Sequence, residues 1–178
     1  MAHLSLTDLV TVIGNIAITL SLVVALVFGV AQVKQAARDR RERLTLETLR
    51  AFQTREFAEF IYTINRGLVP PDQAGLLALP QPAYVAFVQF AQQMEGLGIA
   101  VAEGLVNLDL VDKTLGSFVT TAWERYRPVF TDLRVKTDDP YLGEYFQWLA
   151  ELIAKRMKEN PRPPFYQVGP FGRSAKQP

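Results

Sequence analysis

The chain has 178 residues, 49% of them apolar and 21% charged, a composition typical of one folded domain rather than of a disordered chain. Its 19 Lys and Arg residues nearly balance its 18 Asp and Glu residues, which argues against a nucleic-acid-binding protein. The absence of cysteine excludes disulfides and thiolate metal sites, and the single histidine, His3, lies in the N-terminal segment. We therefore expect no metal, no cofactor and no nucleic-acid partner.

The first element is an uncharged stretch over residues 9–33, in which fifteen of 25 residues are Leu, Ile, Val or Phe. As a helix it extends about 38 Å, enough to cross a hydrocarbon core of about 30 Å. A cleaved signal peptide has a basic start and a shorter apolar core, whereas residues 1–8 contain no Lys or Arg. We expect a retained transmembrane helix over residues 9–33, preceded by a short extracytoplasmic N-terminus.

Basic residues follow this stretch immediately. They are Lys34, Arg38, Arg40, Arg41 and Arg43. Lys and Arg concentrate on the cytoplasmic side of a span, which places the N-terminus outside and the rest of the chain in the cytoplasm. The same side chains are predicted to meet anionic lipid headgroups, each contributing up to about 1 kcal/mol.

Small residues recur every four positions within the predicted span. They are Ala17, Ser21, Ala25 and Gly29. A ladder of small side chains lets a second helix approach closely, because helices associate in lipid by packing rather than by hydrophobicity. The alternative is that this face meets only lipid.

The region 34–159 is predicted to be an all-α cytoplasmic domain of about four helices. The first continues from the span without Gly or Pro as far as Arg66, with a polar gap near Gln53. A possible helical turn over residues 76–79 precedes the second helix, over 83–103.

The third predicted helix is capped by Asn107 or Asp109 and is ended or kinked by Pro128, with a possible continuation over 129–135. Asp139 before Pro140 indicates the start of the last helix, which runs to about Glu159. In that helix we expect Tyr141, Tyr145, Trp148, Leu149, Leu152 and Ile153 to face inward.

Residues 160–178 contain five prolines and two glycines, so they are predicted to form an extended, basic tail. Three aromatic residues in it are unusual for a solvated linker and are candidates for docking on the body or on a partner. They are Phe165, Tyr166 and Phe171. The body itself is acidic, since residues 44–154 carry eight basic and fourteen acidic side chains.

The segment from Ser21-Leu22 through Phe28 and residues 32–35 to Arg38 resembles the membrane exit of a group of small bacterial single-span membrane proteins. Further similarities are Glu95, the passage 104–109, Trp123, Arg134 and the aromatic last helix, so the resemblance covers about residues 15–155. The group has a cytoplasmic all-helical domain of unknown function. The resemblance therefore implies topology and a bacterial inner-membrane location, but no activity.

Few residues suggest chemistry. Glu95 is a candidate acid if burial raises its pKa, but a structural ion pair with Arg125, Arg127 or Arg134 is the simpler interpretation. Asp138 and Asp139 are better explained as a helix cap than as a cation site. We find no phosphate-binding loop and no carboxylate–histidine pairs.

These features predict a non-catalytic single-pass membrane protein without a small-molecule substrate. It would act as a structural or accessory subunit of a membrane protein complex, or form a homo-oligomer, through its span, juxtamembrane helix and tail. The alternative is a membrane-tethered signalling or regulatory adaptor with transient cytoplasmic partners. An enzyme that uses carboxylates alone is a third hypothesis, and it requires a polar cleft around Glu95.

Overall fold

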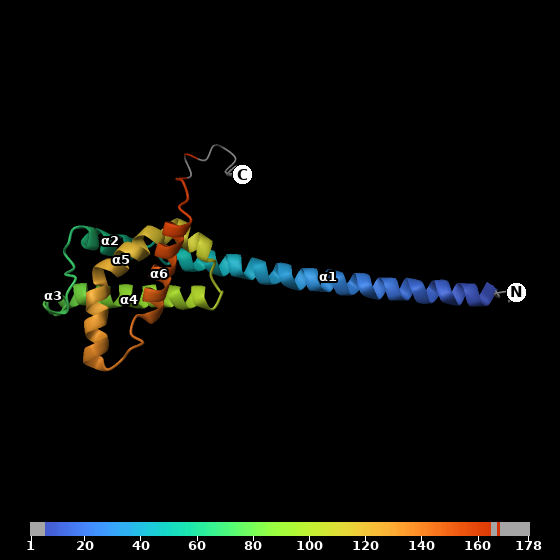
Figure 1. Cartoon of the computed structure of the whole chain (residues 1–178), viewed down its shortest axis with the longest axis horizontal. Helices are drawn as coiled ribbons and strands as arrows, with labels where there is room; N and C mark the ends of the chain where they lie inside the picture. Colours follow the sequence, from blue (N-terminus) through green and yellow to red (C-terminus); the bar gives the residue numbers. More distant parts are fainter. Residues whose placement is uncertain (1–5, 165–166, 168–178) are drawn as a thin grey trace. The chain divides into compact units, whose positions relative to one another are not determined.

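Six helices and no strand are present in the part of the chain that the computed structural model describes, residues 6–164 and Gln167. The helices are α1 (Leu6–Arg50), α2 (Arg55–Asn65), α3 (Gln73–Leu77), α4 (Gln81–Ala102), α5 (Leu108–Thr137) and α6 (Glu144–Glu159). The all-α class predicted from the sequence is confirmed (Figure 1). The chain divides into two compact units, residues 1–43 and 44–178.

Helix α1 ends at Arg50, so the predicted continuous helix to Arg66 is wrong. A turn separates α1 from α2, and the Thr54 hydroxyl accepts a hydrogen bond from the Phe57 amide at 3.2 Å. This bond satisfies one of the free amides at the start of α2, as an N-cap does. Phe52, within the turn, is buried with its ring edge-on to Phe57, 5.1 Å between centroids, so aromatic packing also favours the break.

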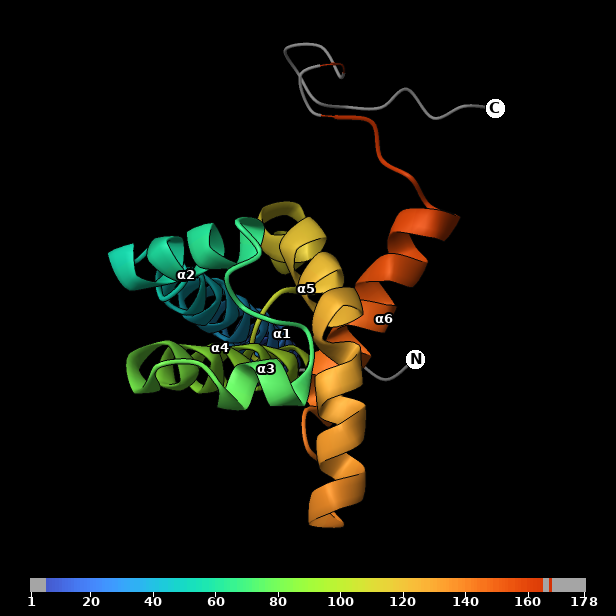
Figure 2. The ribbon, with the colours of Figure 1, turned by 90° about the vertical axis from the view of Figure 1, so that its left-hand side faces the viewer.

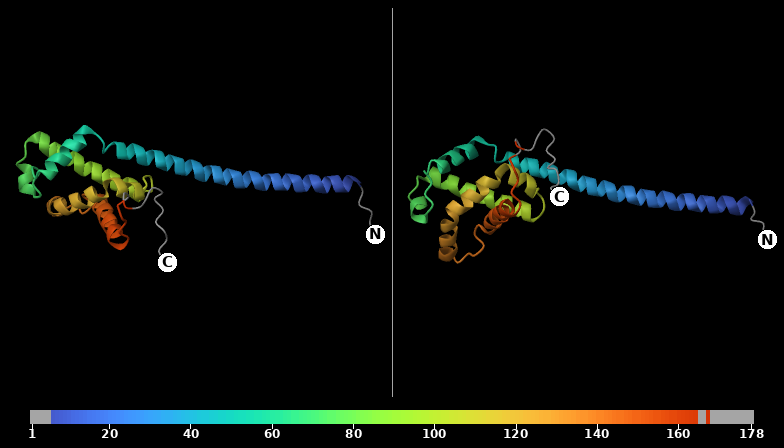
Figure 3. Two further views of the ribbon diagram at one scale, coloured as in Figure 1. Left: turned by 90° about the horizontal axis from the view of Figure 1, so that it is seen from above. Right: turned by 45° about the horizontal axis from the view of Figure 1, so that its top comes forward.

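The core of residues 44–178 is built on an aromatic cluster around Phe90 of α4, which is 2% exposed. Its ring stacks on Phe60 of α2 at 4.9 Å and meets Phe118 and Tyr126 of α5 and Phe146 of α6 edge-on or nearly so. Figure 2 shows α2 above α4 with α5 and α6 to their right, and Figure 3 gives two further views of the same helices. One side chain thus joins four helices.

Helix α5 continues through Pro128, which neither ends it nor separates residues 129–135 from it. Proline removes one backbone hydrogen bond, a cost of about 3 kcal/mol in a helix interior. The two residues that follow, Val129 and Phe130, are buried in the core, and their packing favours continuation. At the other end Asn107 is the N-cap, and its side-chain oxygen accepts from the Asp109 amide at 2.8 Å.

The predicted start of the last helix at Asp139–Pro140 is wrong, because α6 begins at Glu144. Asp138 ends α5 with a φ of 52°, and the Asp139 carboxylate accepts from the Tyr141 amide at 3.0 Å within the connecting turn. A φ of 71° makes Gly143 suited to the position before α6.

The prediction of the inward-facing residues in this region is confirmed for Leu149 and Ile153 and wrong for Tyr141 and Trp148. The buried residues of α6 are Phe146, Leu149, Ala150 and Ile153. Tyr141 and Trp148, predicted to face inward, are 69% and 40% exposed. Residues 160–164 follow without helix, and the predicted docking residues Phe165, Tyr166 and Phe171 lie outside the described residues.

Candidate functional site

The apolar part of α1 presents its side chains outward on all sides. Within the unit formed by residues 1–43, every described residue from Val10 onward is exposed, including fourteen Leu, Ile, Val and Phe residues up to Val33. A helix of the soluble interior with this composition would be buried. Helix α1 is therefore long and apolar enough to span a membrane, a property that it shares with a signal sequence.

The ladder of small residues lies entirely on the surface of α1. Ala25 and Gly29 line a shallow open groove together with Leu26, Val30, Val33 and Lys34, whereas Ala17 and Ser21 lie outside it. A Cβ atom added at Gly29 would meet nothing within 4 Å. The four predicted positions thus form one open stripe, of which two contribute to a groove.

The basic residues of the juxtamembrane run, Lys34, Arg38, Arg40, Arg41 and Arg43, are all exposed on α1. Arg38 forms an i, i+4 ion pair with Glu42 at 3.3 Å, and the Gln35 amide donates to the Asp39 carboxylate at 2.8 Å. The two acidic residues of the run therefore engage neighbours in their own helix, and Glu42 offsets the charge of Arg38. The run retains a net positive charge.

The last turns of α1, residues 44–50, belong to the same compact unit as α2–α6. Thr45 is fully buried, and its hydroxyl accepts a hydrogen bond from the Asn107 amide at 2.9 Å. Leu49 is buried one turn later. Sequence reasoning missed this attachment, because a single threonine in a mainly polar stretch carries no signal of its long-range partner.

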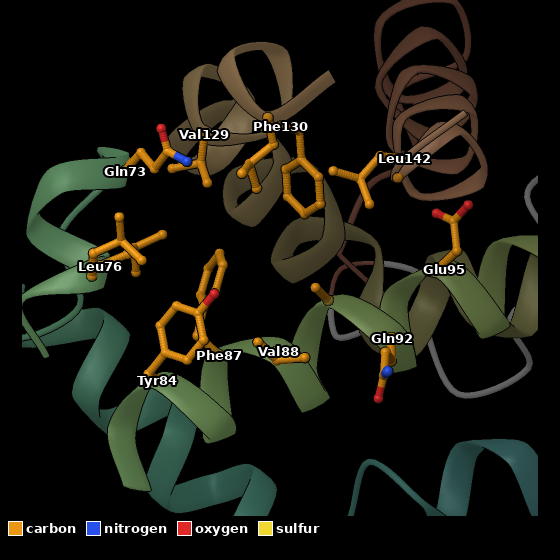
Figure 4. Close-up of a pocket in the computed structure, with 14 residues that line it drawn as sticks. Gln73, Leu76, Tyr84, Phe87, Val88, Gln92, Glu95, Val129, Phe130 and Leu142 are labelled. Carbon is orange, nitrogen blue, oxygen red and sulfur yellow. The ribbon is translucent and has the colours of Figure 1, made fainter. Parts of the chain in front are cut away.

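An apolar pocket of about 270 Å³ lies between α3, α4 and α5. The sequence analysis did not predict it. Its walls include Leu76 of α3, Phe87 and Val88 of α4, and Val129 and Phe130 of α5 (Figure 4). The remaining lining residues are Gln73, Leu77, Tyr84, Ala91, Gln92, Glu95, Leu133, Leu142 and Gly143. The Gln92 side chain points away from the cavity in Figure 4, and the lining is mainly apolar, with Gln73, Tyr84 and Glu95 as its other polar members.

Glu95, the candidate acid, holds the start of α6. One carboxylate oxygen accepts from the Tyr145 amide at 3.2 Å and the other from the Phe146 amide at 2.9 Å. Among the described residues the expected ion pair with an arginine does not form; instead the carboxylate satisfies two free amides and meets the positive end of the helix dipole.

Arg134 of α5 also holds the turn between α5 and the start of α6. Its Nε donates to the Leu142 carbonyl at 2.8 Å, and its Nη1 donates to the Gln147 amide oxygen at 2.7 Å. Glu95 and Arg134 therefore fix both sides of the α5–α6 turn, and both have structural partners. In the core of the body, burial raises the pKa of Tyr126, whose hydroxyl donates to the Val69 carbonyl at 3.3 Å.

Within the described residues, no group of three or more His, Asp or Glu side chains is arranged to hold a metal ion. The cleft beside Glu95 is apolar rather than polar, and its only carboxylate is already bonded to backbone amides. The arrangement is suited to binding apolar groups.

A family model described as a domain of unknown function, DUF4760, matches residues 16–153. No curated protein and no solved structure matches the chain. The match covers most of the chain, and the chain belongs to this family. This match confirms the part of the predicted resemblance that concerns a domain of unknown function over about residues 15–155.

Proposed function

We propose that this DUF4760 protein is a non-catalytic, single-pass protein of the bacterial inner membrane that serves as an accessory subunit of a membrane protein complex. The observation that carries the proposal is the apolar surface of α1, where fourteen large apolar residues between Val10 and Val33 are exposed. An exposed apolar surface of this extent requires lipid or another protein to cover it.

A retained span is favoured over a cleaved signal sequence for two reasons. Residues 1–8 contain no basic residue, and the uncharged stretch of 25 residues is longer than the 7–15 of a signal peptide core. The basic run after Val33 supports a cytoplasmic location for the C-terminal body, next to anionic headgroups.

The surface that contacts a partner helix in the membrane is proposed to be the stripe of Ala17, Ser21, Ala25 and Gly29. Its support is the open groove at Ala25 and Gly29, where the small side chains leave room for a second helix to approach. The juxtamembrane helix and the C-terminal tail are proposed to extend this contact into the cytoplasm.

The test compares Ala25→Leu with Val24→Leu, which places the same leucine side chain one position away and outside the groove. Each tagged chain is purified from its native membrane in a mild detergent, and the mass and stoichiometry of the associated proteins are determined. We expect a fixed-ratio assembly with the wild type and Val24→Leu, and its loss with Ala25→Leu. A wild-type monomer or homodimer alone would overturn the proposal. An assembly that survives both substitutions would favour the adaptor alternative.

A further inference from the structure

The apolar pocket between α3, α4 and α5 is elongated along α4. Its lining residues on α4 begin at Tyr84 and end at Glu95, and their helical spacing places them on one face of the helix. Between these two residues the helix rises about 16 Å. Figure 4 shows Gln73 at the Tyr84 end of the cavity and Leu142 at the other end. A volume of about 270 Å³ spread over this length forms a narrow channel rather than a round cavity.

The middle of this channel is lined by side chains that cannot hydrogen-bond. Val88 and Ala91 line it from α4, and Val129, Phe130 and Leu133 line it from α5. A buried water needs two to four polar partners, and these side chains provide none. A hydrocarbon group is therefore a better occupant of this part of the channel than water is.

The two ends of the channel differ in access. At the end next to α6, Gly143 is buried and the Glu95 carboxylate is already bonded to two backbone amides. At the end next to α3, the lining residues Leu77 and Tyr84 are exposed. A ligand with an apolar chain and a polar head group therefore enters with the chain first and keeps its head group beside α3.

The polar lining residues beside α3 offer hydrogen-bond donors. The Lys136 ammonium donates to the amide oxygen of Gln73, whose amide nitrogen points toward the α5 wall in Figure 4. The Tyr84 hydroxyl is a further donor. Of the acidic residues nearby, Asp72 accepts from a backbone amide of α3 at 2.8 Å, and Asp132 lies one turn before Lys136 on α5. The lining at this end contains no carboxylate, so it suits a head group that only accepts hydrogen bonds.

We propose that the pocket binds a linear fatty acid, with its hydrocarbon chain along α4 and its carboxylate beside Gln73, Tyr84 and Lys136. A carbon chain advances roughly 1.3 Å per single bond, so a channel of about 16 Å accepts about 10–12 carbons. Each methylene buried strengthens binding about fourfold. The proposal goes beyond the proposed function, because it concerns helices α3–α6 and does not rest on the membrane assignment.

Photoaffinity labelling of the full chain locates the bound ligand. The protein is kept in digitonin, a steroid detergent without a linear alkyl chain, and is irradiated with a dodecanoic acid that carries a diazirine near the end of its chain. We expect the label at the closed end of the channel, in peptides that contain residues 91–95 or 142–143. A label confined to other peptides, or spread over all exposed apolar residues including those of α1, would overturn the proposal.

A matched pair of substitutions on α4 tests the channel itself. Val88→Trp fills the middle of the channel, where Figure 4 shows Val88 facing Phe130. Val85→Trp adds the same side chain at a similarly exposed position outside the lining. We expect Val88→Trp to lower the labelling of the channel at least about tenfold and Val85→Trp to leave it unchanged, since a filled channel excludes the ligand. Circular dichroism checks that both variants fold, and equal labelling of the two would overturn the proposal.

Competition with unlabelled compounds tests the class of ligand on the wild-type chain. We expect dodecanoic acid to displace the probe at a concentration at least about tenfold lower than octanoic acid, which buries four fewer methylenes. Dodecylamine, whose head group only donates hydrogen bonds, and 1-naphthoic acid, which has a ring system in place of the chain, should also be weaker by at least about tenfold. Displacement by any of the three at the same concentration as dodecanoic acid would overturn the proposal.

Discussion

The two units of the chain use apolar residues in opposite ways. In residues 10–43 the apolar side chains of α1 surround the helix and are exposed, whereas in residues 44–164 many of them face inward and build a core around Phe90. Helix α2, for example, buries Phe57, Phe60 and Ile64, which recur at helical spacing. The arrangement of apolar residues around the helix, rather than their number, distinguishes a surface for lipid from a surface for a protein core.

The largest expected effect on stability is at Phe90, in the core of residues 44–164. Phe90→Ala removes a ring that contacts helices α2, α5 and α6, so we expect a loss of about 3–5 kcal/mol in the free energy of unfolding. Denaturant unfolding of the full chain in detergent, followed by circular dichroism, measures it. Val135→Ala, at a residue 80% exposed, is the control and is expected to change stability by less than about 0.5 kcal/mol. Equal effects would show that Phe90 does not organise the core.

The next prediction concerns the exposed apolar surface of α1, which is proposed to meet lipid. Val24→Arg places a charge near the middle of the proposed span, and we expect a cost of about 2.5–3.5 kcal/mol for membrane insertion. The fraction of chain that remains in carbonate-washed membranes measures this cost. Arg40→Ala, in the basic run, serves as the control and should leave that fraction nearly unchanged. Retention of the Val24→Arg chain at the wild-type level would argue against a span centred there.

Two glycines of α4 offer a paired test of close packing. A Cβ at Gly98 would collide with the Tyr145 carbonyl oxygen, whereas a Cβ at Gly96 would meet nothing within 4 Å. We expect Gly98→Ala to destabilise the body by about 1–3 kcal/mol and Gly96→Ala to stabilise it by about 0.5–1 kcal/mol. Thermal unfolding of the two variants measures both effects. The same sign for both would contradict the packing of α4 against the start of α6.

A smaller effect is expected at the α5–α6 turn. Glu95→Ala leaves the Tyr145 and Phe146 amides without their acceptor, and we expect a loss of about 1–2 kcal/mol in the free energy of unfolding. Hydrogen exchange at the first turn of α6 should also accelerate. Glu103→Ala, at an exposed position just after α4, is the control. Unchanged exchange at α6 would show that the carboxylate does not hold this end.

Sequence reasoning predicts the elements that depend on local patterns. The uncharged stretch of α1, the helical spacing in α4 and α5, and the Asn107 cap are all read from neighbouring residues. The break after Arg50 was not predicted, because no Gly or Pro marks it. The Thr54 cap acts together with the burial of Phe52 in the core, and the local sequence does not indicate that burial. The start of α6 was misplaced, because the local signal of Asp139–Pro140 forms a turn instead.

The candidate site depends on contacts between distant residues, which a single sequence does not contain. Glu95 lies fifty residues before the amide of Tyr145 that it binds, and Thr45 lies 62 residues before Asn107. The pocket likewise exists only because α3, α4 and α5 meet. Glu95 was selected from the sequence as a residue of interest, but its two backbone partners at the start of α6 were not predicted.

The membrane role of α1 is tested most directly by the intact mass of the natural chain in carbonate-washed membranes. A retained span predicts the full chain of 20.0 kDa in the membrane fraction. A chain shortened by the apolar N-terminal stretch, or the full chain in the soluble fraction, would contradict the account.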